Sequence, residues 1–314
     1  MSAIASEEAT LVAVPRARRR LGAAGLRPYL YILPVVASLG FWIYWPLLRT
    51  FFLGFYTWNL LPTTPRVWVG LGNYARVVGL QEMGIALRNT LIYVVGMLPL
   101  SVALPLGIAL LTQNLGARAR GVYRALIFMP MLMAPVVVAT IWDWMLDPTG
   151  GLVDSLLHAV FGLGPVYWLN SQTWAIWVIT AIAGWKVVGF AVLIFAAALT
   201  GVSREYLEAA AVDGAAAWQR TWHIVVPLIL PSILLVVMLT VLLSAQWTFP
   251  LINVMTQGGP VNATTNIYFE LWQFGFQSYN VGWASAAAVL LFLGFGVIAW
   301  GFTALTNRVA YRDS

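Results

Sequence analysis

Six apolar runs, each long enough to cross a membrane as a helix, dominate this sequence of 314 residues. A transmembrane helix needs about 20 apolar residues to span ~30 Å of hydrocarbon. Only 9% of the residues are charged, whereas a soluble domain carries about 25%, so the chain lacks the charges to cover a water-facing surface. The sequence therefore predicts an all-α integral membrane protein with six transmembrane helices. The runs cover residues 29–55, 86–112, 125–146, 174–200, 228–252 and 282–305.

The arginines are distributed unevenly between the two sides of such a protein. Five arginines precede the first run, three lie in 114–124, two in 201–227 and two near the end of the chain. The opposite loops and helix ends hold four, which are Arg49, Arg66, Arg76 and Arg88. Because positive charge favours the cytoplasmic side, both termini are predicted to be cytoplasmic. The expected organisation is a tail over 1–28, a six-helix domain over 29–306 with a cytoplasmic loop at 201–227, and a tail over 307–314.

Other composition features exclude some classes of function. Basic residues that flank apolar runs are typical of membrane topology, so the net charge of +6 does not indicate nucleic-acid binding. The chain has no cysteine, which excludes disulfides, thiolate metal sites and cysteine nucleophiles. The first run is longer than the 7–15 apolar residues of a signal peptide, so it is expected to be a retained helix.

The cytoplasmic loop contains an unusual polar stretch, EYLEAAAVDGAAAWQRTWHIVVPLILP, over residues 205–231. Ser203 is placed to cap a helix, and Glu205 then falls in its first turn, where a carboxylate suits the positive helix end. Gly214 permits the backbone to turn, and a second short helix is expected over 218–226. The stretch predicts a short helix–turn–helix. It either connects two crossings as a solvated loop or offers an alanine-rich surface to another protein.

The spacing of residues in this loop resembles the signature loop of bacterial ABC-importer permease subunits. Three residues follow the Glu-Ala-Ala sequence before a Gly, nine more precede an Ile, and two more precede a Pro. The family has Leu before that Pro, where this chain has Val226. The resemblance implies a type I importer fold in which the loop docks onto a separate ATP-hydrolysing subunit. The residues it implicates in coupling are Glu208, Ala209, Ala210, Asp213, Gly214, Ile224 and Pro227.

Two outer segments, 55–77 and 255–276, are similar to those of the carbohydrate-uptake branch of this family. The branch imports sugars in some members and glycerol 3-phosphate or its diesters in others, and the sequence leaves the two open. The resemblance implies a second permease subunit, two ATP-binding subunits that hold ATP and Mg, and an extracytoplasmic solute-binding protein, in a bacterial cytoplasmic membrane. The chain lacks a G-x-x-x-x-G-K-[ST] phosphate loop. It is therefore expected to bind no cofactor itself and to be a transport subunit, not an enzyme.

Polar residues within the predicted helices are candidates for the solute pathway. Lys186 lies near the middle of its crossing, where a lysine is costly and should face other helices or a wet cavity. It either contacts solute or donates to backbone carbonyls or a partner subunit. The same two possibilities, solute contact or hydrogen bonding between helices, apply to a cluster in the fifth crossing. This cluster is Ser244, Gln246, Trp247 and Thr248.

Two other classes of protein are less compatible with the sequence. An ion-coupled secondary transporter would need deep carboxylates or matched broken helices, and Asp143 lies near the outer end of its crossing. An intramembrane enzyme would need a catalytic pair or metal ligands at membrane depth. The two histidines, His158 in a predicted outer surface helix over 154–161 and His223 in the cytoplasmic loop, lie outside the crossings.

Overall fold

The computed structural model describes residues 27–113 and 115–310, which belong to two compact units, Met1–Arg49 and Thr50–Ser314. The predicted tails over 1–28 and 307–314 therefore lie largely outside the described residues. The first unit contains α1 (Arg27–Leu39), a five-residue π-helical segment η2 (Gly40–Tyr44) and the start of α2 (Trp45–Leu53). Tyr31–Leu53 is long and apolar enough to cross a membrane, which agrees with the predicted first crossing.

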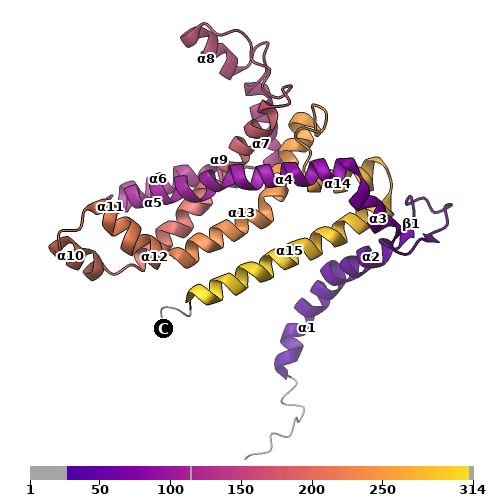
Figure 1. The fold of residues 1–314 in the computed structure, drawn as a ribbon, viewed down its shortest axis with the longest axis horizontal. Helices are drawn as coiled ribbons and strands as arrows, with labels where there is room; N and C mark the ends of the chain where they lie inside the picture. The colour runs from indigo at the N-terminus through magenta and orange to yellow at the C-terminus, as the bar shows by residue number, and fades with distance from the viewer. Residues whose placement is uncertain (1–26, 114, 311–314) are drawn as a thin grey trace, which may run out of the picture. The chain divides into compact units, whose positions relative to one another are not determined.

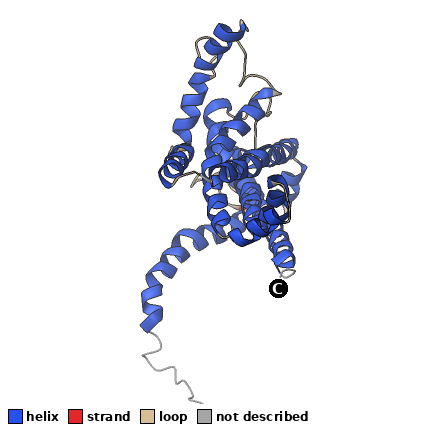
Figure 2. Ribbon diagram, turned by 90° about the vertical axis from the view of Figure 1, so that its left-hand side faces the viewer, coloured by secondary structure: helices blue, strands red, loops and turns tan. Residues whose placement is uncertain are grey.

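The second unit consists mainly of helices (Figures 1 and 2). Its only departure from the all-α prediction, within the part of the chain that the structure describes, is a two-stranded antiparallel hairpin in which Tyr56 pairs with Trp68. The elements are β1 (Tyr56–Thr57), β2 (Val67–Trp68), α3 (Gly72–Gly79), α4 (Gln81–Leu98), η3 (Pro99–Ala103), α5 (Leu104–Thr112), α6 (Ala117–Leu132), α7 (Pro135–Met145), α8 (Leu152–Phe161), α9 (Trp174–Thr200), α10 (Arg204–Val212), α11 (Ala217–Arg220), η4 (Thr221–Val225), α12 (Val226–Leu228), α13 (Leu230–Leu251), η5 (Ile252–Thr256), α14 (Ile267–Trp272), η6 (Gln273–Gln277) and α15 (Val281–Ala310).

Five described helices or helix runs meet the length and hydropathy that a membrane crossing requires. The predicted crossing over 174–200 coincides with α9 at both ends. The predicted crossing over 125–146 is wrong as a single helix, because α6 and α7 meet at an angle of 92°. If this bent pair forms one crossing, the number of crossings is six, as predicted.

The sequence of the break explains why the helix ends there. Pro135 is the first residue of α7, where a proline is well tolerated. A proline also disfavours helical backbone at the residue before it, and Ala134 is extended with ψ of 133°. Met133 is extended as well, with ψ of 138°. The Met-Ala-Pro sequence therefore divides a run that is uniformly apolar.

Helix α9 is the centre of the second unit. Among the candidate crossings, α9 has the largest share of buried residues. In its most apolar stretch 61% of the residues are buried, against 28% or less in the other crossings. Ile179 of α9 packs with Tyr93 of α4, Leu251 of α13 and Phe269 of α14 in one core cluster. A side chain at Gly189 would collide with the backbone of α6, so only glycine allows these two helices to approach so closely.

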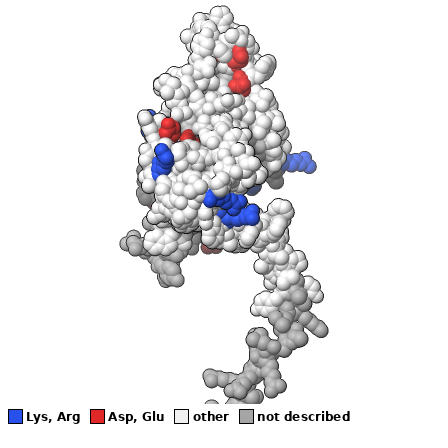
Figure 3. All heavy atoms as spheres, turned by 90° about the vertical axis from the view of Figure 1, so that its right-hand side faces the viewer, with Lys and Arg blue, Asp and Glu red and all other residues white. Residues whose placement is uncertain are grey.

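Short elements of the second unit lie at its two opposite ends (Figure 1). Helices α10 and α11 lie at one end, which the arginine distribution predicts to be cytoplasmic. The hairpin, α3 and α14 lie at the other. Figure 3 shows the second unit from the end that carries the hairpin and α3, where a few basic and acidic side chains lie among mostly uncharged ones.

Candidate functional site

Helix α10 forms where local sequence signals place it. The Ser203 Oγ accepts a hydrogen bond of 3.2 Å from the backbone N–H of Glu205, which confirms the predicted N-cap. Glu205 lies in the first turn, next to the positive end of the helix dipole. The alanines that follow have the highest helix propensity, so a short exposed helix is stable there.

The end of α10 is closed by a glycine-dependent cap. The N–H of Gly214 donates to the Ala211 carbonyl over 3.1 Å, and the N–H of Ala215 donates to the Ala210 carbonyl over 2.9 Å. This pair of hydrogen bonds is a Schellman motif. Gly214 has φ of +83°, a conformation that residues with a side chain rarely adopt. The predicted turn at Gly214 is thereby confirmed.

The second helix of the loop is longer than predicted. It begins at Ala217 and continues as α11, η4 and α12 to Leu228, instead of ending at Val226. The Gln219 Oε1 accepts from the backbone N–H of Ala216 at the start of the helix. Arg220 donates to the Leu207 carbonyl over 3.4 Å, and this bond connects the second helix to α10.

The residues implicated in coupling are all at least partly accessible to solvent. Ala210 and Ile224 are half-buried, and the other five are exposed. Asp213, Gly214 and Ile224 line one hollow of about 470 Å³, whereas the remaining four do not border it. The loop therefore offers an open surface that no other described part of the chain covers.

Exposed apolar side chains on the same loop were not among the predicted coupling residues. The side chain of Val212 is 88% exposed, and those of Trp218 and Trp222 are 61% and 62% exposed. Grouped exposed apolar side chains are typical of protein or membrane contacts. In the sequence, the indication that these side chains are exposed was their position in the polar loop, on either side of Gly214.

Lys186 donates a hydrogen bond of 2.8 Å to the Met133 carbonyl. Met133 follows the last residue of α6, at the bend between α6 and α7. A carbonyl at a helix end lacks an intrahelical partner, and the ammonium supplies one. The half-buried position and this bond favour the structural interpretation of Lys186 over direct solute contact.

The structure separates the cluster in the fifth crossing into different environments. Thr248 is fully buried and accepts a 2.8 Å hydrogen bond from the Asn266 amide. Ser244 is also buried, and its Oγ has no partner among the described residues. Trp247 packs against the core, and Gln246 alone is exposed. The cluster is therefore not one continuous polar wall of a solute pathway.

Asn266 was missed by the sequence analysis although it holds several elements together. Its amide nitrogen also donates to the Ala245 carbonyl over 2.8 Å. Its Oδ1 accepts from the N–H of Phe269 and so caps α14. Asn266 thus fixes the start of α14 to α13, near the end of the crossing. The only local signal was an asparagine just before an apolar helix.

A second set of missed residues lies on one face of α4 and holds the segment 257–266. The Asn89 amide donates to the carbonyls of Asn262 and Thr265, over 2.9 and 3.0 Å. The Tyr93 hydroxyl donates to the Thr264 carbonyl over 2.9 Å. Asn89 and Tyr93 are four residues apart and therefore share a helix face. These bonds satisfy backbone groups that would otherwise be buried without partners.

Glu270 is a buried carboxyl that the sequence analysis did not single out. Its side chain is 3% exposed, and one of its oxygens has no partner among the residues described. Burial, together with the nearby charge of Glu82, raises the pKa of Glu270 to about 7. Glu270 lies in α14, between the crossings that contain α13 and α15.

The two histidines make local hydrogen bonds only. The His158 Nδ1 lies 3.1 Å from the Leu163 carbonyl oxygen, and the His223 Nδ1 lies 3.0 Å from that of Gln219. The helix α8, which carries His158, occupies the predicted surface segment 154–161. In the described ranges, no group of three or more acidic residues and histidines could hold a metal ion.

Known proteins resemble this chain over most of its length. The sn-glycerol-3-phosphate transport system permease protein UgpA of Agrobacterium fabrum is 28% identical over 290 residues, which cover 90% of this chain and 96% of that protein. The trehalose/maltose transport system permease protein MalF of Thermococcus litoralis is 30% identical over 282 residues, covering 90% and 92%. A solved bacterial alginate ABC transporter, in complex with an alginate pentasaccharide-bound periplasmic protein, contains a chain of the same fold. It has a TM-score of 0.76 at 21% identity, and 93% of this chain and 98% of that chain are covered.

These likenesses confirm the resemblance drawn from the coupling loop. They also confirm that the chain is a multi-pass transport subunit and not an enzyme, since the two relatives are transport permeases. Residues 103–310 match the family described as binding-protein-dependent transport system inner membrane component, and the chain belongs to this family of ABC-importer permeases.

Proposed function

We propose that this chain is the permease subunit of an importer for a carbohydrate or related polyol in the bacterial cytoplasmic membrane, with both termini in the cytoplasm. A trehalose/maltose permease is among its relatives, and its fold resembles a chain of an alginate transporter. The arginine distribution supports the orientation. ATP and Mg are held by partner subunits, and this chain performs no covalent chemistry.

The observation that carries the proposal is the exposed helix–turn–helix of α10 and α11. Its helices are capped by their own residues, so the loop keeps its shape without a partner. Its Glu208-Ala209-Ala210 face and the hollow beside Gly214 remain open. An alanine-rich face allows another backbone to approach closely, and Glu208 offers a charge to a basic partner. We assign this surface to contact with the ATP-hydrolysing subunit.

The proposed assembly contains a second, homologous permease, two ATP-binding subunits and an extracytoplasmic solute-binding protein. The family description and the alginate transporter with its periplasmic protein support the last of these. ATP and the loaded binding protein would each favour one of two arrangements of the helices. ATP-driven movement of the loop opens the solute cavity outward, and hydrolysis returns it toward the cytoplasm.

A second candidate solute is glycerol 3-phosphate or a glycerophosphodiester, since UgpA is a relative of similar identity. Lys186 is the cation that could contact such a solute within a crossing. Lys186 donates one bond to the neutral Met133 carbonyl, which leaves its charge and two of its three N–H donors available to an anion.

The test is ATPase stimulation of the reconstituted complex with its binding protein, across neutral sugars, glycerol 3-phosphate and glycerophosphodiesters. Stimulation by a neutral sugar supports the carbohydrate proposal. Stimulation by the phosphorylated solutes alone selects the second candidate. Failure of any ATPase subunit to assemble with the chain would refute the assignment of the coupling loop.

A further inference from the structure

A cavity of about 630 Å³ lies between the ends of three membrane-crossing helices and the coupling loop. The end of α5, the first turns of α6 and the end of α9 border it on one side, and α10 and α11 border it on the other. Four of its fourteen lining residues are arginines, and none is Asp or Glu. These arginines, which we call the arginine cluster, are Arg120, Arg124, Arg204 and Arg220.

No described residue of the chain neutralises the charges of the arginine cluster. Arg120 donates to the carbonyls of Gln113 and Leu115, over 2.9 and 2.8 Å, and both acceptors are neutral. Arg220 donates only to the neutral Leu207 carbonyl. Arg124 and Arg204 have no hydrogen-bond or ion-pair partner within the described part of the chain. Four guanidinium groups around one cavity repel each other unless an anion lies among them.

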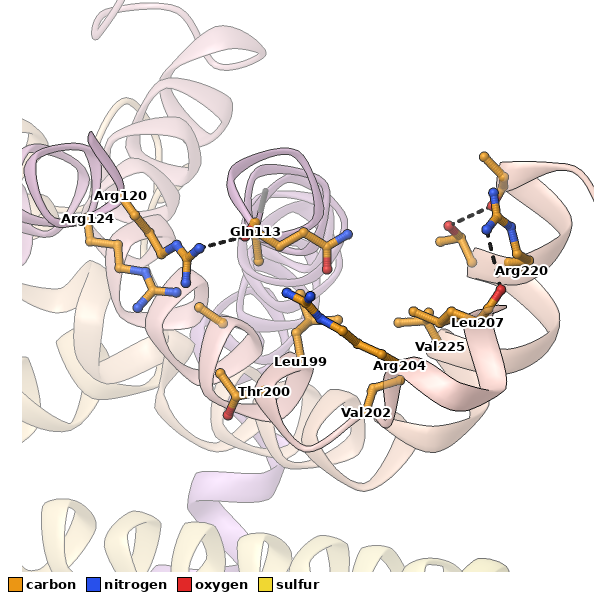
Figure 4. Close-up of a pocket in the computed structure, with 14 residues that line it drawn as sticks. Gln113, Arg120, Arg124, Leu199, Thr200, Val202, Arg204, Leu207, Arg220 and Val225 are labelled. Carbon is orange, nitrogen blue, oxygen red and sulfur yellow. Dashed lines mark hydrogen bonds between the residues drawn. The ribbon is translucent and has the colours of Figure 1, made fainter. Parts of the chain in front are cut away.

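Buried donors strengthen the case for a ligand. The Nε atoms of Arg120, Arg124 and Arg220 are buried, and none has a partner among the residues that the structure describes. A buried donor without a partner is costly. Figure 4 shows Arg120 and Arg124 on one side of the cavity, Arg204 reaching toward its middle and Arg220 at the far side. A compact anion inside the cavity would be approached from several directions.

Phosphate is the anion that this arrangement fits best. Arginine forms paired hydrogen bonds with the oxygens of phosphate groups, and it is the preferred residue for such recognition. Apolar side chains, including Leu199, Val202 and Leu207, line the cavity between the arginines. A ligand with a phosphate group and an apolar or glycerol portion satisfies both surfaces.

The depth of the cavity points to the membrane as the source. The crossing helices end at Thr112 and Thr200, next to the residues that line the cavity. Lipid headgroups occupy the layer just beyond the hydrocarbon, and basic pockets between helices on the cytoplasmic side suit anionic headgroups.

We propose that the arginine cluster binds the phosphate group of an anionic phospholipid of the inner leaflet, directly behind the coupling loop. Bound there, the lipid connects the ends of α6 and α9 to α10 and α11 through one shared anion. The orientation of the loop then depends on the lipid composition of the membrane.

The experiment measures lipid binding to the delipidated full-length chain by native mass spectrometry. The probes are phosphatidylglycerol and, as the neutral comparison, phosphatidylcholine. The test variant is Arg124→Gln with Arg204→Gln, because these two side chains have no described partner to lose. The control is Arg118→Gln with Arg66→Gln, which removes the same charge away from the cavity. Size-exclusion profiles and an Arg124→Lys, Arg204→Lys variant show whether loss of binding is a folding defect.

We expect phosphatidylglycerol to bind more tightly than phosphatidylcholine. Its affinity should fall by about tenfold or more in the test variant, a typical effect of losing charge-assisted hydrogen bonds, and by less than about twofold in the control. Equal binding of both lipids, or equal loss in both variants, would overturn the proposal. Binding of inorganic phosphate or glycerol 3-phosphate in place of the lipid would overturn the lipid source and leave a phosphate site. Displacement of the lipid by the ATP-hydrolysing subunit would assign the cavity to the protein interface instead.

Discussion

The ammonium group of Lys186 lies 2.8 Å from the carbonyl oxygen of Met133, the residue at which the α6–α7 pair turns by 92°. The two residues are far apart in the sequence and belong to different helices. A helix that breaks inside a membrane exposes carbonyls that water cannot reach, and each needs another donor. The lysine is therefore part of what makes the break stable.

Replacement of Lys186 by Met should destabilise the protein by about 1.5–3 kcal/mol, the usual value of a hydrogen bond to a charged group. Lys186→Arg should retain much of this stability, because the guanidinium still donates. Unfolding of the purified chain in detergent measures the loss. A variant Lys186→Met with normal stability and a more than tenfold weaker solute response would instead support solute contact.

Gly214→Ala should reduce solute-stimulated ATP hydrolysis while leaving the chain inserted in the membrane. A side chain at φ of +83° costs roughly 1–2 kcal/mol, and the Schellman cap of α10 would open to avoid this strain. Gly201→Ala is the matched control, since Gly201 has φ of −82°. Equal coupling in the two variants would contradict a role for the cap.

Glu208→Arg should weaken the association with the ATP-hydrolysing subunit by about tenfold or more, because it reverses a charge on the exposed face of α10. Glu205→Arg changes the charge equally on the same helix and serves as the comparison. Co-purification of the complex at two salt concentrations measures the effect. If both variants assemble as well as the parent chain, the docking face lies elsewhere on the loop.

Asn266→Leu should cost about 2–4 kcal/mol of stability, because a buried amide with three hydrogen bonds is removed. Thr248→Val should cost less, since it removes one of these partners. A double-mutant cycle should give an interaction energy of about 0.5–3 kcal/mol between the two residues. Strictly additive effects would show that the Asn266–Thr248 bond contributes nothing to stability.

The carboxyl of Glu270 predicts a pH dependence with a defined direction. Its pKa is raised from an ordinary value of 4.5 to about 7, so the folded protein holds a proton that the unfolded chain has lost. Stability should therefore be greatest below about pH 4.5, fall as the pH rises toward 7 and change no further above it. Melting temperatures from pH 4.5 to 8 should show that Glu270→Gln is more stable than the parent at pH 8 and equal to it at pH 4.5. A constant difference across this range would exclude titration of Glu270.

Features governed by neighbouring residues were predictable from the sequence. The cap at Ser203 and the turn at Gly214 depend on a few adjacent residues, and both were predicted. The bend at Met133 was also encoded locally, by Pro135, but uniform hydrophobicity concealed it. Hydropathy measures only the length of an apolar run, and two short helices at an angle give the same signal as one straight helix.

Contacts between distant residues could not be predicted in this way. Nothing near Lys186 in the sequence indicates Met133 as its partner, and nothing near Thr248 indicates Asn266. The cluster around Gln246 was predicted as one group because its members are adjacent in sequence. A helix directs adjacent residues to different sides, so Thr248 is buried while Gln246 is exposed. Only the packing of α13 against its neighbours determines which side lines a pathway.

Helix α13 is connected to other elements near both of its ends. At one end it continues from the coupling loop through α12, and near the other Asn266 ties it to the segment that precedes α14. Displacement of α13 along its axis must therefore move this segment with it or break the bonds to Asn266. The helix can therefore transmit an axial displacement from one of its ends to the other. A displacement applied to α13 at the coupling loop would therefore be transmitted to the opposite end of the second unit.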